Sequence, residues 1–95
     1  MLKVIAKVIL KSEDSVDFVK QEMLKLGVET RQETGCEEYL LHQDRDDSRV
    51  FFFYETWNSE SELTAHLKTD HVAAYVEATK GMIESFAMNK LDIVE

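Results

Sequence analysis

The stretch Val50–Trp57, which reads VFFFYETW, decides the fold of this chain. β-Branched and aromatic residues favour strands, so the stretch is predicted to be a β-strand. Its alternation puts apolar side chains on both faces: Phe51, Phe53 and Trp57 on one, and Val50, Phe52 and Tyr54 on the other. An antiparallel strand with one solvated face is usually polar on that side, and each aromatic left in water would forfeit about 1.5–3 kcal/mol. We therefore expect a partner sheet or a ligand cavity on the second face, the alternative being a strand with some exposed aromatics.

Regular periodicities place the preceding elements. Leu2–Leu10 alternates between an apolar and a mixed face, which predicts a strand. A helix is predicted next, with the capping candidates Ser12, Asp14 and Ser15 and the apolar stripe Val16, Val19, Met23 and Leu26. It ends at Gly27 or runs on to Thr30. Cys36–Gln43 alternates again, and the polar turn Asp44–Ser48 joins it to VFFFYETW as a hairpin.

The last third of the chain is predicted to be helix and then strand. Ser59 and Glu62 match the capping box S-x-x-E, so a helix begins directly after the aromatic strand. A break near residues 69–70 separates it from a second helical stretch, whose markers are Val72, Val76 and Ile83, with Gly81 near its end. Phe86–Val94 is predicted to be the closing strand.

This β-α-β-β-α-β order predicts an α+β, ferredoxin-like fold: a four-stranded antiparallel sheet with the helices on one face. Ninety-five residues without a linker or internal repeat form one domain, residues 1–95. Because the aromatic strand is apolar on both faces, we expect a two-fold homodimer whose second faces pack into a shared barrel, a dimeric α/β barrel.

Composition excludes several partners and locations. Asp and Glu total 19 against 11 Lys and Arg, and the formal net charge of −8 disfavours nucleic acid and anionic membrane surfaces. No apolar run is long enough for a membrane span. The one cysteine, Cys36, has no partner for an internal disulfide. We therefore expect a cytoplasmic protein.

Known site motifs are absent, and no cofactor or metal is expected from them. Cys36 stands among acidic residues that raise a thiol pKa, so we interpret it as an inert core thiol. His66 and His71 are five residues apart on a broken helix, and without a nearby third ligand they make a weak metal pair. Calcium binding is not expected either, because no loop of oxygen ligands is present.

What remains is a set of polar groups among aromatics: Tyr39, His42, Tyr54, Glu55, Trp57, His66, His71 and Tyr75. His66 lies beside the apolar stripe of Leu63 and Leu67. A neutral imidazole with a pKa of about 6.5 suits a general base or a hydrogen-bond donor; the alternative is a structural histidine bonded to backbone where the helix breaks. Glu55 is either a strand-edge charge or a buried acceptor that orients a histidine.

The segment YETWNSESELTAHLKTDHVAAY resembles the signature of the antibiotic biosynthesis monooxygenase domain. The matching positions are Glu55, Trp57, His66, Thr69, His71 and Tyr75, and GCEEYLLHQD resembles the family's second strand at Gly35, Cys36 and Tyr39. The resemblance covers essentially the whole chain. It implies a homodimeric barrel, and enzymes of this kind commonly oxygenate quinols or polyphenol-like aromatics with O2 and without flavin, haem or metal. Others isomerise phosphorylated signalling sugars or degrade haem, and the haem-degrading pattern matches this chain poorly.

The resemblance also implies roles for the residues. His66 or His71 is expected to be the catalytic base or hydrogen-bond donor, with Trp57 and Tyr75 as cavity walls. Tyr39, Tyr54 and Glu55 complete the expected substrate-binding set. The leading hypothesis is a cofactor-independent monooxygenase that oxidises a quinol or related small hydroxyaromatic with O2. The alternatives are an isomerase of a small oxygenated or phosphorylated metabolite, and a non-catalytic dimeric module that binds a small molecule.

Overall fold

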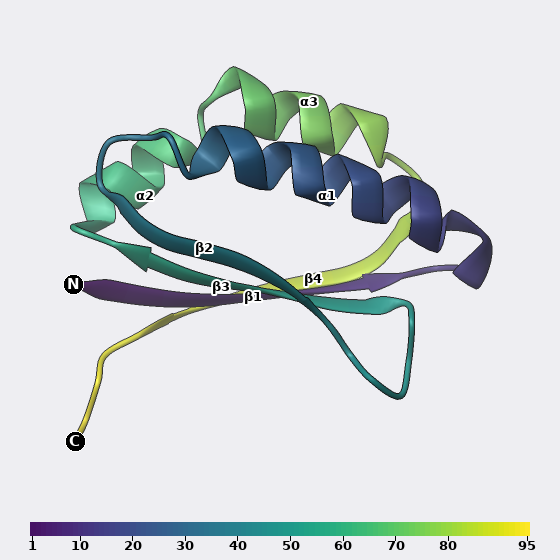
Figure 1. The fold of residues 1–95 in the computed structure, drawn as a ribbon, viewed down its shortest axis with the longest axis horizontal. Helices are drawn as coiled ribbons and strands as arrows, with labels where there is room; N and C mark the ends of the chain where they lie inside the picture. The colour runs from purple at the N-terminus through teal and green to yellow at the C-terminus, as the bar shows by residue number, and fades with distance from the viewer.

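Four antiparallel strands form one open sheet in the computed structural model, which describes all residues 1–95 (Figure 1). The strands are β1 (Leu2–Leu10), β2 (Cys36–Gln43), β3 (Val50–Trp57) and β4 (Ile83–Leu91), in the spatial order β2-β3-β1-β4. The aromatic strand β3 is therefore central, between β2 and β1. The predicted ferredoxin-like α+β fold is confirmed.

The helices all lie on one face of this sheet (Figure 1). They are α1 (Val16–Thr30), which follows the short 3-10 turn η1 (Glu13–Ser15), and then α2 (Glu60–His66) and α3 (Asp70–Ala78). None of them is both long and apolar enough to cross a membrane. The predicted second helix is thus two helices, separated at the break expected near residues 69–70.

The core lies between the helices and the sheet, and strand alternation selects its members. The inward residues are Val4, Ala6, Val8 and Leu10 of β1 and Phe51, Phe53 and Trp57 of β3, packed against Val19, Met23 and Leu26 of α1. These side chains are the apolar sets that the two periodicities predicted. Full burial of each large one contributes about 1.5–3 kcal/mol, which is why the helices cover this face.

Of the three capping candidates, Ser12 caps the turn η1, where its hydroxyl accepts from the Asp14 amide at 3.0 Å. Ser15 is the N-cap of α1 and makes no side-chain capping bond. At the other end the helix passes Gly27 and ends at Thr30, whose hydroxyl donates to the Leu26 carbonyl at 2.7 Å. Of the two predicted ends, the longer one is correct.

The start of α2 was placed correctly, but its capping box does not form. Ser59 is the N-cap, yet its hydroxyl lies 2.9 Å from the Ser61 hydroxyl and makes no capping bond. The Glu62 carboxylate packs over Gly35 instead, so close that a Cβ there would lie 1.1 Å from Glu62 Oε2. Tertiary packing against the turn before β2 has replaced the local bond.

The predicted boundary between the last helix and the last strand is wrong. Helix α3 ends at Ala78, and Gly81 takes a φ of +82°, a left-handed conformation that a helix cannot continue through. Ile83, predicted to be helical, begins β4 opposite Leu10. The strand therefore covers Ile83–Leu91 rather than Phe86–Val94, and residues 92–95 follow it outside the sheet.

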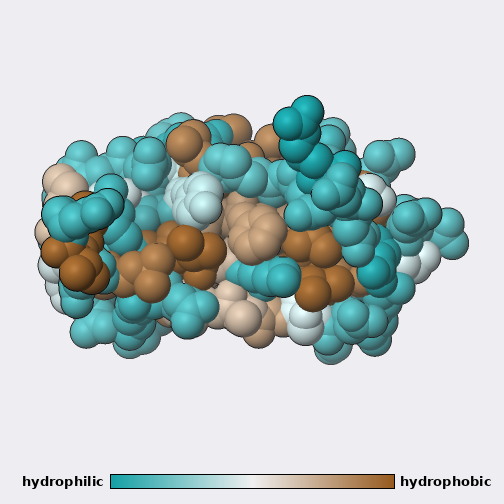
Figure 2. All heavy atoms as spheres, turned by 90° about the horizontal axis from the view of Figure 1, so that it is seen from below, coloured by the Kyte–Doolittle hydropathy of each residue, from teal (hydrophilic) through white to brown (hydrophobic).

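The face of the sheet that the helices leave bare carries an apolar patch across its strands (Figure 2). Leu40 and Tyr54 are 47% and 45% exposed there. We call this surface the open-face patch and define it as Ile5, Ile9, Leu40, Phe52, Tyr54 and Leu91. The predicted two-sided apolar character of β3 is confirmed.

Candidate functional site

A cavity of about 110 Å³ lies between the helices and the sheet. Ten of its twelve lining residues are hydrophobic, and the other two are Glu55 and His66. The floor comes from all four strands, through Ala6, Val8, Tyr39, Phe53, Glu55, Phe86 and Met88; the roof consists of Leu26, His66, Leu67, Val72 and Tyr75. No lysine or arginine reaches this surface, so the cavity suits a small uncharged molecule.

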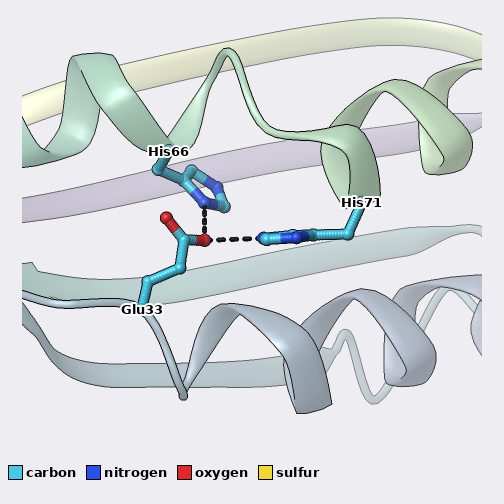
Figure 3. A group of neighbouring side chains, drawn as sticks. All are labelled: Glu33, His66 and His71. Carbon is cyan, nitrogen blue, oxygen red and sulfur yellow. Dashed lines mark hydrogen bonds and ion pairs between the residues drawn. The ribbon is translucent and has the colours of Figure 1, made fainter.

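Glu33 joins the two histidines of the second half of the chain at the roof of the cavity (Figure 3). One of its oxygens, Oε2, lies 2.6 Å from His66 Nδ1 and 2.7 Å from His71 Nε2. Glu33 stands in the turn between α1 and β2, His66 ends α2, and His71 lies in the first turn of α3. The break between α2 and α3 is what lets both rings turn toward the same oxygen.

These hydrogen bonds set the protonation pattern of His66. An ionised carboxylate only accepts hydrogen bonds, so the proton of the neutral ring is on Nδ1 and Nε2 keeps its lone pair. The His66 side chain is 4% exposed, and its ring packs against Trp57 and Tyr39, at centroid distances of 4.9 and 5.7 Å. His66 is therefore fixed in orientation, with a free basic nitrogen.

The environment also keeps His66 neutral. Burial lowers its pKa, and the hydrogen bond and negative charge of Glu33 oppose that effect without cancelling it. A neutral imidazole can accept a proton, and the imidazolium that results would be stabilised by Glu33 at 2.6 Å. The alternative of a histidine bonded to backbone does not hold, since the ring bonds a side-chain carboxylate.

Glu55 is buried in the sheet floor. Its Oε1 accepts from Trp57 Nε1 at 2.9 Å, and burial, with a smaller contribution from the charge of Glu33, raises its pKa to about 7. Of its two predicted roles, the buried acceptor is correct, but its donor is the indole of Trp57 rather than a histidine. Trp57 in turn packs against the His66 ring and does not line the cavity, so its expected role as a cavity wall is wrong.

Two tyrosines add hydroxyl groups near the cavity. Tyr39 belongs to β2 and Tyr75 to α3, and both side chains line the cavity. The Tyr75 hydroxyl is buried without a hydrogen-bond partner, and burial raises the pKa of Tyr75 to about 12. Both phenols therefore remain protonated at neutral pH, because burial also raises the pKa of Tyr39.

Tyr54 does not belong to this site, which corrects its predicted role. It points to the bare face of the sheet, where its ring meets His42 edge-on at a centroid distance of 4.8 Å. The physical reason is the period of two: Tyr54 lies between Phe53 and Glu55, which face the cavity. His71 lies outside the cavity wall as well; its ring centroid is 6.0 Å from that of His66, and both rings bond Glu33.

Sequence reasoning missed Glu33, the residue that organises the site. Glu33 is 33 positions from His66 and 38 from His71, too far for any local pattern to connect them. The expectation that the two histidines lack a third group is therefore wrong. The three polar atoms lie within 4.8 Å of one another, a spacing that a metal site also has. Here both ring nitrogens lie at hydrogen-bond distance from one oxygen of Glu33.

Cys36 behaves as predicted. It lies at the start of β2 and is partly buried. Burial raises the pKa of its thiol to about 11, with Glu33 and Glu55 contributing in the same direction. A thiol that stays protonated is a poor nucleophile and a poor metal ligand.

Comparison with known proteins agrees with the geometry. A family model described as antibiotic biosynthesis monooxygenase matches residues 1–78. A crystal structure described as an antibiotic biosynthesis monooxygenase is 30% identical, covers 100% of both chains and has a TM-score of 0.94. A Pseudomonas aeruginosa protein is 26% identical over 99% of this chain and 94% of its own, with a TM-score of 0.91.

A more distant structure, a conserved protein from Methanosarcina mazei, shares the fold at 22% identity, with a TM-score of 0.86 over 95% of this chain and 89% of that one. No curated protein matches this chain. The family model nevertheless covers most of the chain, including β1 to β3 and both histidines. The chain therefore belongs to the antibiotic biosynthesis monooxygenase family.

Proposed function

We propose that this protein is a cofactor-independent monooxygenase that oxidises a quinol or related small hydroxyaromatic with O2. One observation carries the proposal: a neutral imidazole, held by a carboxylate at 2.6 Å, stands in the wall of a cavity that is mostly apolar. Such a site can take the proton from an aromatic hydroxyl while it excludes water. Membership of a monooxygenase family supports the same reaction class.

The substrate supplies the electrons of this reaction and O2 supplies the oxygen atom that enters the product. His66 Nε2 accepts the hydroxyl proton, and the electron-rich phenolate reduces O2 to form a ring hydroperoxide. Loss of water from the hydroperoxide leaves a quinone, so one oxygen atom enters the product and the other leaves as water. The substrate supplies all four electrons, and the proton held by His66 returns to the departing oxygen. The protein contributes orientation, a base and a dry site.

The charge of the cavity separates this reaction from the isomerase alternative. A phosphorylated ligand brings charge that must be paired when it is buried. The cavity wall contains no lysine or arginine, and Glu33 places a negative charge beside it. A phosphorylated substrate is therefore disfavoured, whereas an uncharged ring fits the apolar wall.

We further propose that the working form is a homodimer joined through the open-face patch. Monomeric proteins rarely expose a large contiguous apolar surface, and Leu40 and Tyr54 are each nearly half exposed here. A second copy related by a two-fold axis would cover both patches at once. Sedimentation at micromolar concentration tests this, and a single subunit would contradict it.

Oxygen consumption with a panel of hydroquinones tests the activity. We expect uptake by the wild type and its loss in His66→Gln. His42→Gln is the matched control, since His42 lies on the opposite face of the sheet, and sedimentation checks that each variant keeps the same oligomeric state. Substrate conversion without O2 uptake would indicate an isomerase, and binding without turnover would indicate a binding module.

A further inference from the structure

The cavity contains a second set of polar atoms that the proposed proton transfer does not use. Glu55 enters from the sheet floor and Tyr75 from the helical roof. The Tyr75 hydroxyl is buried and unpaired. Glu55 uses Oε1 to accept from Trp57, and no side chain or backbone group bonds its Oε2.

Unpaired polar groups of this kind point to a ligand. Buried hydroxyl and carboxyl groups in native proteins nearly always have a hydrogen-bond partner. The Tyr75 hydroxyl makes no hydrogen bond to the other polar groups of the wall, which are His66, Glu55 and the Tyr39 hydroxyl. A bound molecule would give the buried Tyr75 hydroxyl a partner, and the same molecule could bond Glu55 Oε2, which makes no hydrogen bond to the protein.

We propose that Glu55 and Tyr75 are ligand-binding residues that hydrogen-bond an oxygen of the substrate which His66 does not contact. This inference rests on the proposed function and deepens it. It assigns the substrate to rings that carry at least two oxygen atoms, one for His66 and another for Glu55 and Tyr75. A monophenol would fill the same space and leave these groups unpaired.

Both groups are donors under mildly acidic conditions. The Tyr75 phenol is protonated, and burial raises the pKa of Glu55 to about 7, so its carboxyl keeps a proton at pH 6. Together they match a carbonyl oxygen or the oxygen of a second hydroxyl. Glutamine preserves the donor of a protonated glutamate at nearly the same size, which makes Glu55→Gln a conservative variant and Glu55→Leu a disruptive one.

Two probes of almost equal shape test the proposal at pH 6: 4-hydroxyacetophenone, and 4-ethylphenol, which lacks the carbonyl oxygen. Calorimetry should show that the wild type binds 4-hydroxyacetophenone about tenfold more tightly or better, as expected for a site left with unpaired donors by the analogue. Tyr75→Phe and Glu55→Leu should reduce that preference, and Glu55→Gln should keep it. Tyr54→Phe, on the opposite face, is the matched control for Tyr75→Phe.

The outcomes separate the two proposals. Equal affinity for the two probes, with oxygen uptake that still depends on His66, would overturn this inference and leave the proposed function in place. Failure to bind either probe together with no hydroquinone oxidation would overturn both. Circular dichroism confirms that each variant is folded, and the wild-type comparison of the two probes needs no variant at all.

Discussion

Replacing Glu33 by Gln is the sharpest test of the site, because this residue holds both histidines. Glu33→Gln keeps the size of the side chain and removes its charge. The two hydrogen bonds, at 2.6 and 2.7 Å, then change from charge-assisted to neutral. A hydrogen bond to a charged group contributes about 1.5–3 kcal/mol, and a neutral one about 0.5–1.5. The free energy of unfolding should therefore fall by about 2 kcal/mol.

The same substitution should change the titration of His66. Glu33 raises the pKa of this ring against the effect of burial, so its removal should lower the pKa further. Proton NMR of the ring signals measures this directly, because the chain has only three histidines. His42 is an internal control, since its surroundings on the opposite face are the same in both proteins. Oxygen consumption should fall about a hundredfold, as expected when a general base loses its orienting partner.

Glu37→Gln provides the matched control for the change in charge. Glu37 is exposed on β2 and makes no side-chain hydrogen bond or ion pair, so its substitution should leave unfolding, His66 titration and activity unchanged. The reasoning is refuted if Glu33→Gln has the same denaturant midpoint as the wild type and the pKa of His66, measured by NMR titration, does not change. In that case the short contacts at Glu33 would contribute nothing to the site.

Three further predictions concern stability and assembly. Burial raises the pKa of Glu55 from its ordinary value of 4.5 to about 7 in the folded protein. Its contribution to stability is therefore complete below about pH 4.5, and about 3 kcal/mol is lost as the pH rises through 7. Urea unfolding at pH 5 and 8 should show the loss in the wild type and not in Glu55→Gln. Gly35→Ala should destabilise the protein by about 2 kcal/mol or more, because residue 35 has a φ of +86° and the new Cβ would collide with Glu62. Gly81→Ala should destabilise it by about 1 kcal/mol, because residue 81 has a φ of +82° but the new Cβ would meet no other atom. Thermal unfolding of the two variants tests this difference. Leu40→Lys should dissociate the proposed dimer in sedimentation, while Leu24→Lys, an equally exposed change on α1, should not; a dimer that survives Leu40→Lys would place the interface elsewhere.

Local patterns were enough to predict the two central strands of the sheet, β1 and β3. In Leu2–Leu10 and Val50–Trp57 the period of two assigns each side chain to a face before any contact is known, and the structure buries the predicted sets. The same alternation places Glu55 with Phe53 and puts Tyr54 on the opposite face. The role first given to Tyr54 came from the family resemblance and conflicted with that alternation.

The end of α3 was beyond these patterns. Apolar residues at positions 82, 83 and 86 fit a helix or a strand equally well over so short a run. What decides between them is the left-handed turn at Gly81 and the pairing of Ile83 with Leu10 across the sheet. The partner strand lies more than seventy residues earlier in the chain, so the choice depends on tertiary contact.

Hydrophobic periodicity therefore accounts for β1, β3 and α1 and for the faces that they bury, because neighbouring residues set the geometry of those elements. The arrangement of Glu33 with His66 and His71 depends on α1, α2 and α3 packing together on the sheet. Its members come from three separate segments, and a hydrogen bond of 2.6 Å between segments 33 residues apart has no trace in local spacing. The sequence identified the two histidines as candidates, whereas the carboxylate that bonds both of them is evident only in the folded molecule.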